Sequence, residues 1–341
     1  MICAGASAGV SCAFGAPIGG ALFLYELSRG NPVWTFNLLW KTFFTCCTAV
    51  FTMGFFDNTL HGEKVDWSES ALKFAKTQPD QRLPTSILLG ALIIGTISGI
   101  LGALFININF RINGFRGKHQ NKNWKKILEA CLFAFASASA FYWAPYIFST
   151  CLPNEQPALG RVFKDKVLSI WDKSEDYDIS RGWCKEGTYN PLATLMWKTE
   201  AGVIRQMMDA DVLATRTQMF AFAGVWYFFF VTTYGIFLPS GLFLPGMIIG
   251  CAIGDLYTHF CIGVGLMNAD EKNNYRVTFI ILAMCSMLAG YTRMTYSIIV
   301  VTLETSQSIS IFLPIVIACG TSNIVGDFFN RSLYERAVRG K

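Results

Sequence analysis

The stretch Tyr234-Gly-Ile-Phe-Leu-Pro-Ser-Gly-Leu-Phe-Leu-Pro-Gly-Met-Ile-Ile-Gly250 joins two apolar segments through residues that break helices. Irregular backbone at membrane depth is tolerated where it is buried in protein or lines a polar cavity. A helix that begins after such a break directs free N–H groups into the cavity, where they attract anions. The stretch therefore predicts a membrane fold with broken helices and part of an anion permeation path.

The chemistry around this stretch is neutral. No lysine or arginine occurs between Gln218 and Asn268, so a bound anion would meet amide and hydroxyl groups rather than fixed cations. A helix N-terminus contributes about 0.3–1 kcal/mol to anion binding, and about 2 kcal/mol when partly buried. Several weak contacts suit permeation, because an ion must leave as well as enter. A structural kink between two packed helices is the alternative, and the loop residues alone leave both open.

Composition predicts an all-α, polytopic integral membrane protein. The 341 residues are 52% hydrophobic and 15% charged, with a mean hydropathy of +0.39, whereas soluble domains carry about 25% charged residues. The net charge of +5 is explained by cytoplasmic lysine and arginine, so we expect membrane lipid and no nucleic acid as partners. Motifs for a nucleophile, a phosphate loop or a metal site are not found, and we expect neither an enzyme nor a cofactor.

Apolar runs predict the membrane helices. They cover residues 2–30 (broken at Gly15-Ala-Pro17), 33–56, 85–110, 127–149, 216–238, 243–262, 274–290 and 308–328, with a short run near 295–304. The stretch 111–126 has six basic residues and no acid, which places it in the cytoplasm. The polar loop 150–198 then lies in a lumen or outside the cell. Cys151 and Cys184 bracket this loop and could form a disulfide in an oxidising compartment.

An internal echo at an offset of 278 residues indicates repeated architecture. Residues 4–9 and 21–28 parallel residues 282–287 and 299–306, each as a small-residue helix, a break and an apolar helix that ends Glu-x-Ser. Paired broken helices in corresponding positions are typical of inverted-repeat transporters. The two glutamates, Glu26 and Glu304, fall at helix ends, where we expect a structural role. Asp255 follows the broken stretch and is expected to be solvated or capped.

Gly-Leu-Phe-Leu-Pro (241–245) with Gly250 resembles the GxFxP…G signature of the CLC chloride channel and transporter family. Residues 4–23 resemble the helix pair that precedes that family's internal glutamates, and residues 326–334 resemble its last membrane helix and pore tyrosine. The resemblance covers nearly the whole chain. Thr233-Tyr-Gly and the residues after Cys184 are most similar to the eukaryotic endosomal and lysosomal branch.

The resemblance implies an inverted-repeat bundle of tilted and broken helices and a set of site residues. The amides of Leu242 and Phe243 and the hydroxyl of Tyr334 would bind chloride, the transported ion. Tyrosine at a membrane interface is also a common anchor, and this alternative stays open for Tyr334. The pore loop would be formed by Ser240, Gly241 and Pro245.

The sequence departs from the family pattern in two respects. The family's serine motif and gating glutamate do not occur, nor does its pair of CBS domains, so residues 1–341 are expected to be a membrane domain lacking its N-terminal helices. Exchangers of the family carry two successive glutamates where this chain has Glu26 and Leu27. Leucine cannot carry a proton, which favours a voltage-gated chloride channel, whereas the branch similarity favours 2 Cl⁻/H⁺ exchange.

Other functions are weighed against this one. A transporter of an organic substrate would need a larger site with more side chains than the pore loop offers. A non-transporting, truncated dimerisation partner is a third hypothesis. The resemblance implies a homodimer through the helices around 16–56 and 295–328, in the endosomal or lysosomal membrane or the plasma membrane.

Overall fold

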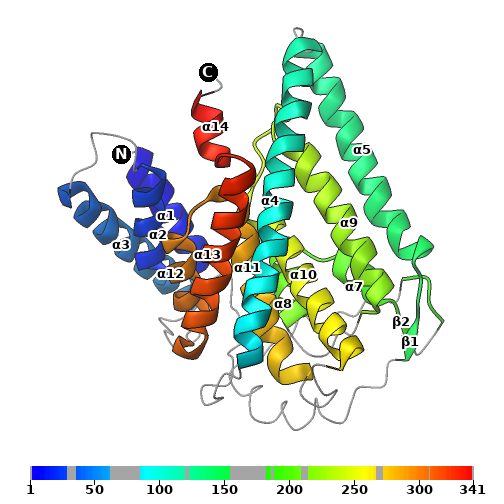
Figure 1. Cartoon of the computed structure of the whole chain (residues 1–341). Helices are drawn as coiled ribbons and strands as arrows, with labels where there is room; N and C mark the ends of the chain where they lie inside the picture. The colour runs from blue at the N-terminus through cyan, green and yellow to red at the C-terminus, as the bar shows by residue number, and fades with distance from the viewer. Residues whose placement is uncertain are drawn as a thin grey trace.

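A computed structural model describes residues 2–28, 36–61, 85–119, 123–153, 182–185, 188–208, 214–265, 272–306 and 308–339. Most of these residues lie in helices, and two short strands form one antiparallel pair (Figure 1). In chain order the elements are α1 (Ile2–Phe14), α2 (Pro17–Leu27), α3 (Phe36–His61), α4 (Thr85–His119), α5 (Asn123–Ile147), β1 (Leu152–Pro153), β2 (Thr188–Tyr189), α7 (Pro191–Met196), α8 (Glu200–Met208), α9 (Arg216–Thr233), α10 (Phe243–Val264), α11 (Lys272–Thr292), α12 (Tyr296–Ser306), the 3-10 turn Ile309–Ile311, α13 (Phe312–Phe329) and α14 (Leu333–Arg339).

Six described helical stretches are long and apolar enough to cross a membrane. They are Asn37–Phe56, Ser86–Lys118, Asn123–Ile147, Phe243–Val264, Tyr275–Thr292 and Ile309–Ala337. The all-α, multi-pass membrane fold expected from composition is confirmed. The run 216–238 yields only α9, which is not among the six, because Arg216, Gln218 and terminal threonines make it less apolar.

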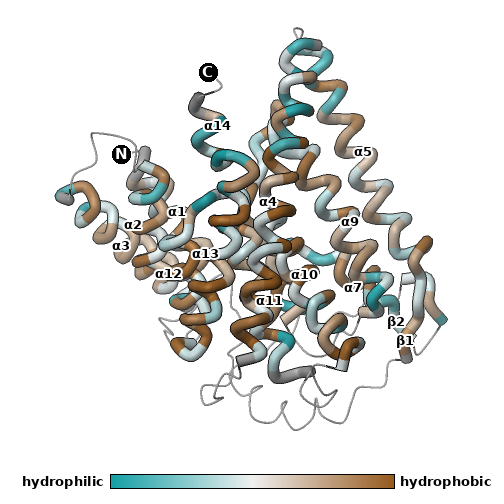
Figure 2. The backbone as a smooth tube through the Cα atoms, in the orientation of Figure 1, coloured by the Kyte–Doolittle hydropathy of each residue, from teal (hydrophilic) through white to brown (hydrophobic). Residues whose placement is uncertain are grey.

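Two helices face outward and one forms the centre of the bundle. The apolar window of α11 is 89% buried, whereas the windows of α3 and α5 are 11% and 6% buried. Figure 2 shows apolar colour along α3, α4 and α5, and polar colour where α4 ends and α5 begins and on α14. Apolar side chains in such numbers on an outer surface suit contact with lipid rather than with water. The bundle therefore has a protein-buried axis at α11 and a lipid-facing rim.

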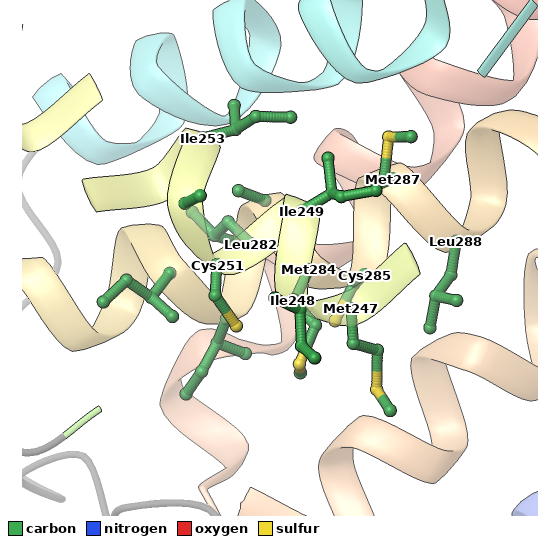
Figure 3. Packing of buried hydrophobic residues seen from close by; sticks show 14 of the residues in the cluster. Met247, Ile248, Ile249, Cys251, Ile253, Leu282, Met284, Cys285, Met287 and Leu288 are labelled. Carbon is green, nitrogen blue, oxygen red and sulfur yellow. The ribbon is translucent and has the colours of Figure 1, made fainter. Parts of the chain in front are cut away.

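A glycine stripe holds α10 against α11. Gly246, Gly250 and Gly254 recur every fourth residue of α10 and lie on one face of the helix. A Cβ at Gly250 or Gly254 would lie 2.5 or 2.6 Å from the backbone of Met284 or Ile280 in α11. Around this contact pack Met247, Ile248, Ile249, Cys251, Ile253, Leu282, Cys285, Met287 and Leu288 (Figure 3). Small residues let membrane helices approach at backbone distance, as they do here.

The predicted break at Gly15-Ala-Pro17 is present and separates α1 from α2. The echo of α1–α2 in α11–α12 also has a structural counterpart, because α2 and α12 cap each other. Both carboxylate oxygens of Glu26, at the end of α2, accept N–H groups of residues 295–297 at the start of α12, at 2.9–3.0 Å. The carboxylate of Glu304, near the end of α12, accepts the N–H groups of Ile18 and Gly19 at 3.2 and 2.9 Å. The two helices therefore lie antiparallel and are closed head to tail.

The described structure differs from the expected elements at two places. Helix α4 does not end near residue 110 but continues to His119 through most of the basic stretch. In this extension Arg116 donates to the carbonyl of Thr232 in α9, a contact that the sequence does not display. In the polar loop 150–198, the structure places the β1–β2 pair and α7, and a disulfide joins Cys151 to Cys184 with the Cα atoms 5.8 Å apart. Residues 154–181 of this loop lie outside the described residues.

We expect Gly250→Val to destabilise the protein by about 1–3 kcal/mol, because the new side chain overlaps the α11 backbone and cannot be accommodated by a rotamer change. The measurement is the unfolding temperature of the purified protein in detergent. The control is Gly224→Ala on α9, where a Cβ meets nothing within 4 Å and the helix gains up to about 1 kcal/mol. Equal unfolding temperatures for the two variants would show that the close approach is not needed.

We expect Glu26→Gln to lower the free energy of unfolding by about 1–3 kcal/mol, because an amide leaves at least one N–H group of the α12 start without its charged acceptor. Thermal unfolding in detergent measures the effect, and Glu304→Gln should act in the same direction. The control is Glu335→Gln on an exposed position of α14, where an exposed charge contributes at most about 1 kcal/mol. A Glu26 variant as stable as the Glu335 variant would contradict reciprocal capping.

Candidate anion site at the start of α10

The connection between α9 and α10 is irregular and short. Helix α9 ends at Thr233, α10 begins at Phe243, and residues 234–242 lie between them. Gly235 has a φ of 99°, and a side chain there would overlap Asn113 of α4, so both backbone and space require glycine. Ser240 and Gly241 are exposed in the chain, whereas Leu242 is buried at 8% exposure. The connection thus descends from an exposed stretch to a buried helix start.

The first amides of α10 are available to a ligand. The initial N–H groups of a helix have no partner within it. Across the described residues, we find no hydrogen bond donated by the amide of Leu242 or of Phe243. The helix dipole adds positive potential at the same point. This arrangement can attract an anion by partial charges alone.

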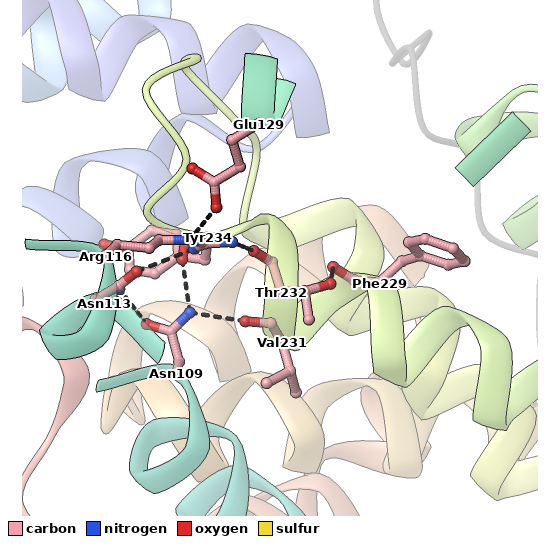
Figure 4. A network of polar contacts seen from close by, with 8 residues as sticks. All are labelled: Asn109, Asn113, Arg116, Glu129, Phe229, Val231, Thr232 and Tyr234. Carbon is pink, nitrogen blue, oxygen red and sulfur yellow. Dashed lines mark hydrogen bonds and ion pairs between the residues drawn. The ribbon is translucent and has the colours of Figure 1, made fainter. Parts of the chain in front are cut away.

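A polar network from α4 caps the end of α9 (Figure 4). The side-chain amide of Asn109 donates to the carbonyls of Val231 and Tyr234, at 2.8 and 2.7 Å. The Nη2 of Arg116 donates to the carbonyl of Thr232 at 2.7 Å. The last carbonyls of a helix lack hydrogen-bond partners within it. Here three side-chain hydrogen bonds provide donors for these carbonyls. The start of the connection 234–242 is thereby fixed to α4.

The cation of this network is neutralised. The Nε of Arg116 lies 2.6 Å from Oε1 of Glu129 on α5, and the two side chains are 11% and 25% exposed. Asn113 links the parts, donating to Oδ1 of Asn109 at 2.8 Å and accepting from Arg116 at 3.1 Å. A guanidinium that is already bonded to a carboxylate and a helix C-terminus has little capacity left for a mobile anion. The loop itself carries no charged side chain, while the ammonium of Lys126, in the first turn of α5, lies over the ring of Phe237 in the loop, 4.8 Å from its centroid.

The other end of the loop is fixed by α11. Tyr291 is completely buried, and its hydroxyl donates to the carbonyl of Leu242 at 2.7 Å. The ring of Tyr291 lies 5.3 Å from that of Phe105 and 5.5 Å from that of Phe230. Gly246 leaves room for it, since a side chain there would overlap the phenol. The buried end of the loop is thus held by one hydrogen bond in an aromatic cluster.

Tyr334 lies in α14 and is half-buried against the core. Arg336 attaches α14 to α4, with Nη1 3.0 Å from Oδ1 of Asn107 and its guanidinium over the ring of Phe110. Pro245, in the first turn of α10, is also half-buried.

The sequence predicts Leu242 and Phe243 at a helix start, which is where the structure has them. The roles of Asn109, Arg116 and Tyr291 are not predicted from the sequence. One signal was available, since Asn107 and Asn109 stand in an apolar run long enough to span the membrane, and polar side chains there need partners. Tyr291 had no such signal, because a tyrosine in an apolar helix gives no indication of what its hydroxyl contacts.

The acids near the site are structural or paired. Glu26 is engaged by the start of α12, including a 2.5 Å contact from the hydroxyl of Ser297, and Leu27 beside it is 41% exposed. The expectation that Asp255 is solvated or capped is wrong, because the carboxylate is buried in an ion pair. It is 1% exposed and bonded at 2.5 Å to Nε of Arg276 on α11, with Nε2 of His259 3.6 Å away.

Comparison with known proteins identifies the family. The model of the voltage gated chloride channel family matches residues 1–327. Chloride channel protein C of Dictyostelium discoideum is 29% identical over 343 residues, covering 100% of this chain and 43% of that protein. The H(+)/Cl(-) exchange transporter 7 of Mus musculus is 29% identical over 345 residues, covering 99% and 40%. The chain thus spans less than half of the length of these relatives.

Solved structures share the fold. The crystal structure of a eukaryotic CLC transporter matches with a TM-score of 0.58 and 20% identity, over 99% of this chain and 45% of that one. A slow cyanobacterial Cl⁻/H⁺ antiporter matches with a TM-score of 0.62 and 16% identity, over 99% and 64%. Because the family model matches nearly the whole length of this chain, the chain belongs to the voltage gated chloride channel (CLC) family.

Proposed function

We propose that the protein carries chloride across a membrane as a channel, and that the ion is held by the amides of Leu242 and Phe243 and the hydroxyl of Tyr334. The observation that carries this proposal is the start of α10, where these amides make no hydrogen bond within the described residues. The loop before it contains no fixed cation. An anion bound by neutral dipoles is held weakly enough to leave again, as conduction requires.

Chloride–proton exchange is the second candidate, because one relative is named an H(+)/Cl(-) exchange transporter and one structural neighbour a Cl⁻/H⁺ antiporter. Two observations favour the channel. Leu27 cannot titrate, and Glu26 beside it has both carboxylate oxygens occupied by the start of α12. A proton passing through Glu26 would have to break these bonds.

The assembly that we propose is a homodimer in lipid. Helices α2, α3, α12 and α13 carry exposed apolar side chains, among them Ile18, Phe44, Tyr296, Leu313 and Ile324. These residues fall within the ranges 16–56 and 295–328 expected at the interface, and their exposure supports this assembly. Endosomal or lysosomal membranes and the plasma membrane are the proposed locations.

Tyr334→Phe should weaken chloride binding in the full-length protein by roughly tenfold, because a hydrogen bond to a charged group contributes about 1.5–3 kcal/mol. Chloride efflux from liposomes, measured against the chloride concentration, gives the half-saturation value. Tyr142→Phe on the exposed surface of α5 is the matched control. A Tyr334 variant that behaves like this control would remove the phenol from the site. Reconstituted protein with no chloride flux would contradict chloride transport itself and favour a non-transporting partner.

A chloride gradient should drive no proton movement. The physical reason is the non-titrating side chain of Leu27, beside a glutamate that is committed to capping a helix. The measurement is the internal pH of proteoliposomes with a clamped membrane potential, while chloride flows down its gradient. Proton transport against a proton gradient, driven by chloride, would establish exchange instead of channel conduction.

A further inference from the structure

The hydroxyl of Tyr291 contacts the peptide that carries one of the two candidate amides. Tyr291 lies in the last turn of α11, has no exposed surface, and donates to the carbonyl of Leu242 at 2.7 Å. A buried phenol needs a hydrogen-bond partner, and most positions along α10 have carbonyls committed to the helix. Leu242 is the residue immediately before α10, so the bond falls at the boundary between loop and helix.

The direction of the Phe243 amide follows from this bond. The carbonyl of Leu242 and the N–H of Phe243 belong to one planar trans peptide, in which the two groups point in opposite directions. Fixing the carbonyl toward Tyr291 therefore turns the N–H away from α11. The carbonyl oxygen has two lone pairs, so it can accept from Tyr291 and also from the first turn of α10.

Tyr291 itself has little freedom to move. The rings of Phe105 and Phe230 pack against it at 5.3 and 5.5 Å, and the bare backbone of Gly246 lies under the phenol. The glycine stripe of α10 sets the distance between α10 and α11, and so the reach of the hydroxyl. A donor held this firmly orients the peptide before an ion arrives, which lowers the free energy of reorganisation on binding.

We propose that Tyr291 is a positioning residue for the anion site: its hydroxyl fixes the Leu242–Phe243 peptide so that the Phe243 N–H faces the ion path. Tyr291 does not contact the ion. This inference rests on the proposed function and adds to it the device that aims the amide. A purely structural phenol would affect stability and leave ion binding unchanged.

Tyr291→Phe removes one oxygen atom and keeps the aromatic packing. The matched control is Tyr227→Phe on α9, whose hydroxyl donates to the carbonyl of Leu101 at 2.8 Å. Both variants remove a hydrogen bond from tyrosine to a backbone carbonyl, but only Tyr291 lies at the start of α10. The full-length protein and both variants are reconstituted in liposomes. Chloride half-saturation, maximal flux and unfolding temperature are measured for each.

We expect Tyr291→Phe to raise the chloride half-saturation by about three- to tenfold, since an amide that is held less firmly loses part of its charged hydrogen bond. Tyr227→Phe should stay within about twofold of the unmodified protein, with a similar loss of stability. Equal half-saturation for the two variants would overturn the proposal. An unmodified protein that neither binds nor transports chloride would instead refute the proposed function, so the two failures can be told apart.

A second variant covers the case in which Tyr291→Phe does not fold. Gly246→Ala keeps the tyrosine but crowds its hydroxyl, and should raise the chloride half-saturation in the same direction. Where both single variants and the double variant fold, the double variant should raise the chloride half-saturation little more than either single change. Both changes act through the same hydrogen bond. A Gly246→Ala variant with unchanged chloride dependence, or fully additive effects, would count against Tyr291 as the orienting group.

Discussion

The close approach of α10 and α11 is the contact on which the rest of the structure depends. Glycine at every fourth position of α10 lets the two backbones meet, and a side chain at Gly250 or Gly254 would overlap α11. Because α11 is the most deeply buried span, α10 is positioned from the centre of the bundle outward. The same contact brings Tyr291 within hydrogen-bond distance of Leu242. The contact between α10 and α11 therefore determines both the packing of the core and the geometry at the candidate site.

Charged side chains in this bundle mainly terminate helices and neutralise one another. Glu26 and Glu304 accept amides at two helix starts, Arg116 donates to a helix end, and the buried Asp255 pairs with Arg276. Each arrangement is favourable because an unpaired charge or helix end in a low-dielectric interior costs several kcal/mol. The connection between α9 and α10 itself carries no charged side chain, so the anion that we propose there would meet mainly backbone and hydroxyl dipoles.

Local patterns in the sequence predict much of the fold, whereas contacts between residues far apart in the chain could not be predicted from it. The break before Pro17 and the helix start near Phe243 follow from glycine and proline at fixed positions. The extension of α4 to His119 depends on Arg116 meeting Thr232, a residue 116 positions away. The ion pair of Asp255 was not predicted because its partner, Arg276, lies on the next helix. No periodicity or local motif encodes such pairs, since their geometry exists only after the helices have packed.

The reciprocal capping of α2 and α12 bears on whether protons can share the path. Ionised Glu26 accepts three backbone amides and one hydroxyl. A protonated carboxyl would keep fewer acceptor sites and would present a donor to amides that are themselves donors. Both oxygens of Glu26 thus act as acceptors in the contact between α2 and α12. In the channel that we propose, this carboxylate holds α12 in place, and the leucine beside it cannot titrate.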